Sequence, residues 1–166
     1  MTDKLSHVDE TGAARMVDVS GKPETHRRAQ ATGSIRMRRE TLSAIVNAEV
    51  KKGDVLGVAR VAGVMAAKRT ADLIPLCHPL TLDDVQVSLT PDESLPGIRC
   101  EGSVATTGRT GAEMEALTSV AIALLTVYDM AKGLDRGMEL SDISLVSKSG
   151  GVSGDYARLD GTSSAT

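Results

Sequence analysis

The sequence predicts a single α+β domain with a ferredoxin-like split βαβ sandwich, in which an antiparallel sheet carries helices on one face. From residue 31 onward the expected elements follow in the order strand, helices, strand, strand, helix, strand, which is typical of this sandwich. The chain has 166 residues, the usual size of one domain. We therefore expect one folded domain over residues 15–157, between a flexible segment at 1–14 and a disordered tail at 158–166.

Hydrophobic periodicity places each element along the chain. Alternating apolar and polar residues indicate strands at 16–19, 31–38, 82–90, 98–105 and 142–147. Apolar residues spaced by three and four indicate helices at 40–48, 54–73 and 111–132. Pro75 ends the second helix because the residue before a proline is disfavoured in the helical conformation. The third and fourth strands form an antiparallel hairpin around the turn at 91–97.

Two of the helices carry apolar stripes. The stripe of the helix at 54–73 consists of Val58, Val61, Ala62, Met65 and Ala66. The helix at 111–132 has a pattern typical of a core-facing side, formed by Met114, Leu117, Ala121, Leu124, Leu125 and Tyr128. Thr110 and Glu113 match a capping box, in which both side chains would satisfy backbone amides at the start of this helix. Gly133 ends it.

Composition argues against several classes of protein. A net charge of −3 is unusual for a nucleic-acid binder, and Tyr128 and Tyr156 are the only aromatic residues. No apolar run approaches the roughly 18 residues of a membrane-spanning helix, and the polar N-terminus does not resemble a signal peptide. We expect a cytoplasmic protein without membrane or nucleic-acid partners. We also expect no metal site, because the Cys and His residues lack ligand spacing.

The segment Leu76-Cys77-His78-Pro79 lies between an expected helix and an expected strand. Prolines at 75 and 79 restrict the backbone on both sides of the Cys-His pair. His78 could hold or transfer a proton, or it could be an ordinary structural residue. Cys77 could be a nucleophile, but adjacent side chains usually point apart, so an inert thiol is the favoured interpretation.

Asp129 and Lys132 lie three residues apart in the last turn of a predicted helix and therefore share a face. The lysine suits the negative end of the helix dipole, whereas the carboxylate does not. Such local conflicts tend to mark functional sites. The pair is either an ordinary surface ion pair or an acid/base couple, in which the carboxylate relays protons and the lysine stabilises negative charge.

Residues 148–155 combine a leading Lys148 with three glycines. Glycines allow backbone amides to converge on an anion, and the lysine adds charge, so this segment is either an anion-binding nest or a flexible terminus. Other basic clusters, such as His26-Arg27-Arg28, either converge on an anionic small molecule or lie on separate solvated surfaces.

Several motifs occur in order along residues 6–157: Met16-Val17-Asp18-Val19-Ser20, Lys52-Gly53-Asp54-Val55, Ala66-Ala67-Lys68-Arg69-Thr70, Leu73-Ile74-Pro75-Leu76-Cys77-His78-Pro79-Leu80, Thr110-Gly111-Ala112-Glu113-Met114-Glu115-Ala116-Leu117-Thr118, Tyr128-Asp129-Met130 and Lys148-Ser149-Gly150-Gly151. Together they closely resemble the MoaC family, the cyclic pyranopterin monophosphate synthases of molybdenum cofactor biosynthesis. The resemblance implies a lyase that converts 3′,8-cyclo-7,8-dihydro-GTP, a cyclic dihydro-GTP, to cyclic pyranopterin monophosphate and pyrophosphate. It also implies a homohexamer, a trimer of dimers, with active sites at subunit interfaces.

The resemblance also assigns site residues within a catalytic domain at 15–157. The implied catalytic residues are Asp129, as the acid/base, with Lys52, Lys132 and His78. The implied substrate-binding residues are Leu76, Cys77, His78, Met114, Glu115, Lys148, Arg27 and Lys22. Val152 departs from the family, which usually has a basic residue there. No carboxylate cage for a metal is visible, so we expect no tightly bound cofactor, although Mg²⁺ could accompany the triphosphate.

The implied chemistry suits these residue types. Rebuilding a purine as a pterin needs several proton transfers, and cations would stabilise the charge on departing pyrophosphate. Each lysine could act in proton transfer or in stabilising the negative charge on pyrophosphate. Two alternatives also remain: an RNA-binding module, because RNA-recognition domains share this order of elements, and a catalytically silent family member acting in assembly, for which Val152 is the hint.

Overall fold

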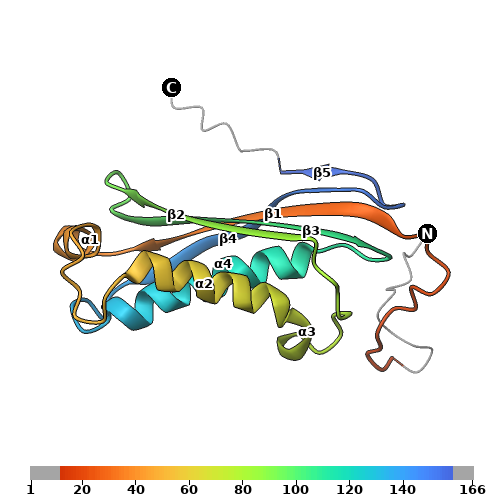
Figure 1. Cartoon of the computed structure of the whole chain (residues 1–166), viewed down its shortest axis with the longest axis horizontal. Coiled ribbons are helices and arrows are strands. Elements are labelled where there is room, and N and C mark those ends of the chain that lie inside the picture. Colours follow the sequence, from red (N-terminus) through yellow and green to blue (C-terminus); the bar gives the residue numbers. More distant parts are fainter. Residues whose placement is uncertain (1–11, 159–166) are drawn as a thin grey trace.

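The computed structural model describes residues 12–158 and shows a sheet with helices layered beneath it (Figure 1). The elements in chain order are β1 (Thr25–Arg36), α1 (Arg39–Val46), α2 (Val55–Lys68), α3 (Thr70–Leu73), β2 (Asp84–Asp92), β3 (Gly97–Gly108), α4 (Glu113–Ala131), β4 (Glu139–Ser149) and β5 (Tyr156–Ala157). Most of the predicted terminal segments, at 1–11 and 159–166, lies outside the described residues.

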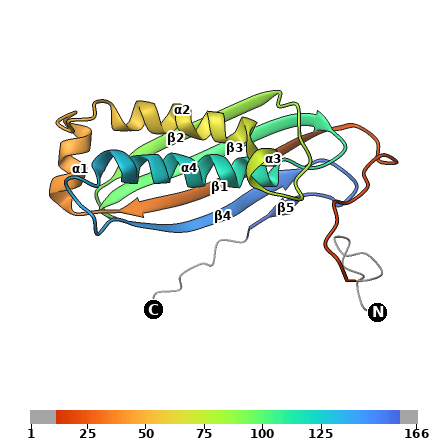
Figure 2. The same cartoon turned by 90° about the horizontal axis from the view of Figure 1, so that it is seen from below.

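The sheet is antiparallel, with strand order β2-β3-β1-β4-β5. The central pair β1 and β3 is in register from Thr25 opposite Gly108 to Arg36 opposite Gly97. Both crossovers, from β1 to β2 and from β3 to β4, carry their helices on the same face of the sheet (Figures 1 and 2). This order of strands and helices confirms the predicted ferredoxin-like sandwich.

Helices α2 and α4 run side by side in opposite directions across that face (Figure 2). They approach closely at Gly63, where an added Cβ would lie 2.9 Å from the Ser119 carbonyl oxygen and 3.2 Å from the Ala123 side chain. A side chain at this point would push the helices apart. The antiparallel packing places the start of α2 beside the end of α4.

The predicted apolar stripes match the buried faces only in part. Leu124 and Ala66 are buried, and Leu117 and Tyr128 pack against the core, but other members are exposed. On α2, Val58, Val61 and Met65 are 48%, 58% and 50% exposed, and on α4 Leu125 is 52% exposed whereas Leu124 is fully buried. The buried faces consist mostly of small residues: Ala59, Gly63, Ala66 and Ala67 on α2, and Ala116, Ser119, Val120, Ala123, Val127 and Ala131 on α4. Large apolar side chains give the strongest hydrophobic periodicity in a sequence, but the close packing of α2 on α4 requires small side chains.

Three local predictions also need correction. Residues 16–19 form a loop and not a strand. The helix predicted at 54–73 divides at Arg69 into α2 and α3. The capping box is absent, because α4 begins after Ala112 and no side chain caps it. By length and composition α4 could span a bilayer, but half of its apolar window is buried in the protein, as in the core helix of a globular domain.

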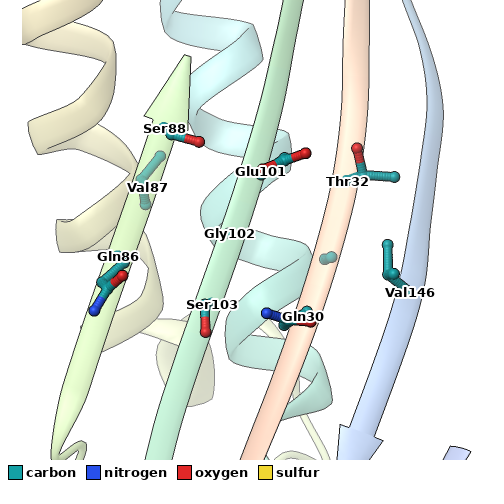
Figure 3. A pocket seen from close by; sticks show the side chains of 10 residues that line it. Gln30, Thr32, Gln86, Val87, Ser88, Glu101, Gly102, Ser103 and Val146 are labelled. Atoms are coloured by element: carbon teal, nitrogen blue, oxygen red, sulfur yellow. The ribbon is translucent and has the colours of Figure 1, made fainter. Parts of the chain in front are cut away.

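No helix of residues 12–158 covers the opposite face of the sheet, which carries a hollow of about 410 Å³ (Figure 3). Most of its exposed lining is short and polar, with Gln30, Thr32, Gln86, Ser88 and Ser103 around Glu101. Its lining contains no aromatic side chain.

Candidate active site

Asp129 is the centre of a three-residue charged cluster at the C-terminal end of α4. Its Oδ1 lies 2.7 Å from Lys132 Nζ and its Oδ2 lies 2.9 Å from Lys52 Nζ. Lys52 also donates a hydrogen bond of 2.9 Å to the Asp129 backbone carbonyl. The predicted pairing of Asp129 with Lys132 is thus present in the structure, together with a second lysine from a distant part of the sequence.

The turn before α2 brings Lys52 to this position. Gly53 has a φ of +93°, in the left-handed region that favours glycine, and its amide donates to the Val50 carbonyl at 2.9 Å. Asp54 then caps α2 by accepting a hydrogen bond from the Gly57 amide. Lys52 therefore extends from a defined turn toward the end of the antiparallel helix α4.

Hydrogen bonds from Lys132 and then Lys52 lower the pKa of Asp129 to about 2. Asp129 is therefore ionised at neutral pH. A carboxylate with so low a pKa is a weak base while both lysines hold it. Because the side chain is 55% exposed, the pairs contribute little to stability. Asp129 can become a stronger base only when a lysine moves from it to another anion.

The cluster opens into a cavity of about 660 Å³ between the turn before α2 and the loop after α4. Its apolar lining comes from Val50, Met130 and Leu134. Its polar lining comes from Glu49, Lys51, Lys52, Asp129, Lys132 and Arg136. An apolar surface with a few converging charges suits a flat ring that carries an anionic group.

A second basic cluster lies where the start of α4 meets the ends of β1 and β4. It lines a cavity of about 130 Å³ that includes the predicted phosphate-binding residues Lys22, Arg27 and Lys148. Arg27 is only 8% exposed. Its guanidinium donates to the carbonyls of Gly108 at 2.9 Å and Arg109 at 3.2 Å, and it forms no ion pair within residues 12–158. A buried cation held only by carbonyls favours binding of an anion.

The glycine-rich segment after β4 packs against Arg27. Gly150 and Gly151 have φ values of +87° and +86°, and a side chain at Gly151 would overlap the Arg27 guanidinium. The Gly150 amide donates a hydrogen bond of 3.0 Å to the Asp155 carboxylate. The segment therefore forms a turn that already binds one carboxylate, as an anion-binding nest can. Val152 is 80% exposed.

Glu113 is a residue whose role the sequence did not reveal. It was interpreted as a helix cap, but its Oε1 lies 3.0 Å from Lys148 Nζ, and both side chains are largely buried. The pair joins the first turn of α4 to the end of β4. Only the sheet order brings these segments together, so no spacing in the sequence could have indicated it.

Cys77 and Glu115 form a partly buried polar contact beside this cluster. Cys77 Sγ donates to Glu115 Oε1 at 3.6 Å, and Glu115 is only 2% exposed, with no hydrogen-bond partner for Oε2 among residues 12–158. Burial raises the pKa of Glu115. Burial and the neighbouring Glu115 raise the pKa of Cys77 to about 11. Cys77 is therefore a thiol at neutral pH, in agreement with an inert role.

The Cys77 contact places the predicted loop at the N-terminal end of α4. Leu76 and Met114 are exposed apolar residues in this region, and His78 is half-buried. The loop at 15–20 passes nearby, because the Asp18 carboxylate interacts electrostatically with His78. Within residues 12–158, no three His, Cys, Asp or Glu side chains gather as metal ligands.

The two halves of the predicted site do not meet within one chain. Glu115 and Asp129 are 14 positions apart on α4, which corresponds to about 21 Å along the helix. Figure 1 shows α3 and the loop that follows it near one end of α4, and the start of α2 near the other. One half contains Lys52, Asp129 and Lys132, and the other contains Lys22, Arg27, Cys77, His78, Met114, Glu115 and Lys148.

Alkylation of Cys77 tests this description of the second half. In a Cys100→Ala variant, Cys77 is the only thiol, and we expect slow labelling by iodoacetamide at pH 8 that accelerates as the pH approaches 11. Glu115→Gln removes the neighbouring negative charge, lowers the pKa of Cys77 and should increase labelling at pH 9. Rapid labelling of the Cys100→Ala protein at pH 7 would contradict a partly buried Cys77–Glu115 contact.

Comparison with known proteins identifies the family. The MoaC family model matches residues 16–151, which include both halves of the site. Proteins named cyclic pyranopterin monophosphate synthase from Brucella ovis and Brucella melitensis are 57% identical over 160 residues, covering 96% of this chain and 97% of theirs. A protein of the same name from Brucella canis is 56% identical over the same coverage. The chain therefore belongs to the MoaC family.

Proposed function

We propose that the protein is a cyclic pyranopterin monophosphate synthase, a lyase that converts 3′,8-cyclo-7,8-dihydro-GTP to cyclic pyranopterin monophosphate and pyrophosphate in molybdenum cofactor biosynthesis. The observation that carries the proposal is the contact of Asp129 with Lys132 and Lys52 at 2.7 and 2.9 Å. These groups can relay protons and stabilise developing negative charge. The family match and the relatives' name support the same reaction.

Ionisation of Asp129 suggests an order of events. In the free protein two lysines hold the carboxylate, which makes it a weak base. An anionic substrate would draw Lys52 or Lys132 toward itself, and the pKa of Asp129 would rise as that contact is lost. Substrate binding would thus create the proton acceptor at the place where it is needed. His78, at the opposite end of α4, would serve as a second proton-transferring group.

The second half of the site suits the triphosphate and the pyrophosphate it releases. Arg27 is buried and pairs with no carboxylate of the described residues, and Lys148 and Lys22 lie around the same cavity. Guanidinium and ammonium groups in a partly desolvated site bind phosphate oxygens strongly. Met114 and Glu115 follow the cavity-lining Glu113 on α4, and Cys77 contacts Glu115. Together with Leu76, these residues would contact the part of the substrate next to the phosphates.

The separation of the halves supports an active site shared between two copies of the chain. A catalytic group must come within about 3 Å of the atom it protonates, yet Asp129 and Glu115 lie about 21 Å apart along one helix. One substrate could contact both only if the Asp129 half came from a neighbouring copy. We propose a homohexamer, a trimer of dimers, in which each interfacial site combines the two halves from different subunits.

The exposed apolar side chains of α2 are a candidate surface for this assembly. Val58, Val61 and Met65 lie along one stripe and are about half exposed or more. Leu125 of the neighbouring helix α4 is exposed to a similar extent. Groups of exposed apolar residues of this kind usually mark protein–protein contacts.

We further propose that the enzyme acts in the cytoplasm without a tightly bound cofactor and without nucleic-acid or membrane partners. Mg²⁺ would enter with the triphosphate, because it is commonly held by substrate phosphates and water. The polar hollow in Figure 3 argues against an RNA-binding module, since its lining lacks aromatic residues on which bases could stack. The assembled Lys52, Asp129 and Lys132 argue against a catalytically silent family member.

Replacement of Asp129 tests the reaction. Asp129→Asn should fold and assemble normally but lower the rate of cyclic pyranopterin formation by about 10²- to 10⁴-fold, because the proton acceptor is lost. Lys132→Ala should have a comparable effect. The measurement is pyrophosphate release from purified protein incubated with the cyclic dihydro-GTP. Glu40→Gln, on the exposed face of α1, is the control. Turnover by Asp129→Asn at the wild-type rate would refute the assignment.

Replacement of Val61 tests the assembly. Val61→Asp places a charge in the exposed stripe of α2 and should reduce the mass measured by light scattering from that of a hexamer, with an unchanged circular dichroism spectrum. Val61→Ala, which keeps the surface apolar, should remain hexameric. If wild type is a monomer at the concentration of the activity assay and still turns over substrate, the shared site is wrong.

A further inference from the structure

The loop between α4 and β4, residues 132–138, forms one wall of the cavity beside Asp129. Gly133, Leu134 and Arg136 line that wall. The loop starts at Lys132, so the wall and one of the catalytic lysines belong to the same short segment. Its geometry therefore affects how a substrate fits against Asp129.

The loop is fixed by a buried carboxylate. Asp135 is 6% exposed and accepts hydrogen bonds from the Arg38 amide at 2.9 Å and the Gly137 amide at 3.0 Å. Arg38 also donates to the Leu134 carbonyl. These bonds attach the loop to the start of α1. The loop also contacts the end of α4.

Tyr128 supplies a side-chain contact between α4 and the loop. Its hydroxyl donates a hydrogen bond of 3.0 Å to the Arg136 carbonyl, eight residues later in the chain. Its ring is half-buried and packs against the core. The adjacent amides of Leu134 and Asp135 bond back to the Ala131 carbonyl at 2.8 and 3.2 Å. The loop is therefore folded back over the last turn of α4, where the Tyr128 hydroxyl adds a side-chain hydrogen bond to these backbone bonds.

We propose that the Tyr128 hydroxyl is a positioning group for the reaction. It holds the 132–138 loop in place beside the cavity when Lys52 or Lys132 moves from Asp129 to the substrate. In the free protein Lys52 also links the turn before α2 to the end of α4, because it bonds to Asp129. When substrate draws Lys52 or Lys132 away, that link weakens. The Tyr128 bond to Arg136 involves no catalytic group, so it persists and keeps the wall in place. The proposal rests on the assignment of this cavity as half of the active site.

The test uses Tyr128→Phe, which removes the hydroxyl and keeps the ring. Without substrate, hydrogen exchange of the amides at 134–137 should become faster, whereas exchange in the middle of α4 should not change. With the cyclic dihydro-GTP, KM should rise by about two- to tenfold, the effect of one lost hydrogen bond, and kcat should stay within about twofold of wild type. Tyr156→Phe, which alters the exposed tyrosine of β5, should change neither property.

The outcomes are distinct. Faster exchange at 134–137 together with a rise in KM supports the proposal. Unchanged exchange, or faster exchange with unchanged KM, overturns it, as does a kcat that falls as far as in Asp129→Asn. A general loss of fold in Tyr128→Phe also overturns it, because the hydroxyl would then be structural. Absence of turnover by wild type would instead refute the proposed function, and the exchange measurement, made without substrate, separates the two failures.

Discussion

The close antiparallel packing of α2 on α4 is the constraint on which both halves of the site depend. Gly63 allows the two helices to approach until an added Cβ would clash with the backbone at Ser119. Because the helices run in opposite directions, Lys52 in the turn before α2 contacts Asp129 at the end of α4. By the same geometry, the chain leaving α2 passes through α3 and brings Cys77 against Glu115, at the start of α4.

Both halves hold their functional cations with internal carboxylates. Asp129 binds Lys52 and Lys132, and Glu113 binds Lys148. Asp155 likewise accepts a hydrogen bond from the glycine turn at Gly150. An anionic substrate would compete with these carboxylates for the cations. Part of the electrostatic energy gained on substrate binding would therefore only offset the loss of the existing ion pairs. Arg27 differs, because in the part of the chain that the structure describes its guanidinium bonds to carbonyls and to no carboxylate. It is therefore the strongest candidate for the primary phosphate contact.

The sequence predicted the order of the main elements and the contact between Asp129 and Lys132, but not the buried face of α2. Alternation located β1 to β4, because it reports local geometry, but the strand that it predicted at 16–19 is a loop. The predicted stripe of α2 is largely wrong because Val58, Val61 and Met65 resemble core residues, whereas the buried face of α2 contains Ala59 and Gly63. If the proposed assembly buries these three exposed side chains, their apolar character reflects contacts between subunits and not the core of one chain.

For the site, local spacing was sufficient only where the partners share a helix. The Asp129–Lys132 pair follows from a spacing of three. Lys52 came from the family resemblance, because nothing local connects it with Asp129. The Glu113–Lys148 pair was missed, since it depends on sheet order, and a capping box offered a simpler explanation for Glu113. The separation of the two halves becomes visible only when both ends of α4 are placed in space.

The shared active site is the central claim, and complementation between inactive variants tests it most directly. Asp129→Asn damages one half and Lys148→Ala damages the other. If each site takes its halves from different subunits, unfolding and refolding the two variants together should restore activity in about a quarter of the sites. A mixture of Asp129→Asn and Lys132→Ala, which damage the same half, should remain inactive. Mixed hexamers of the first pair that show no recovered activity would contradict the account.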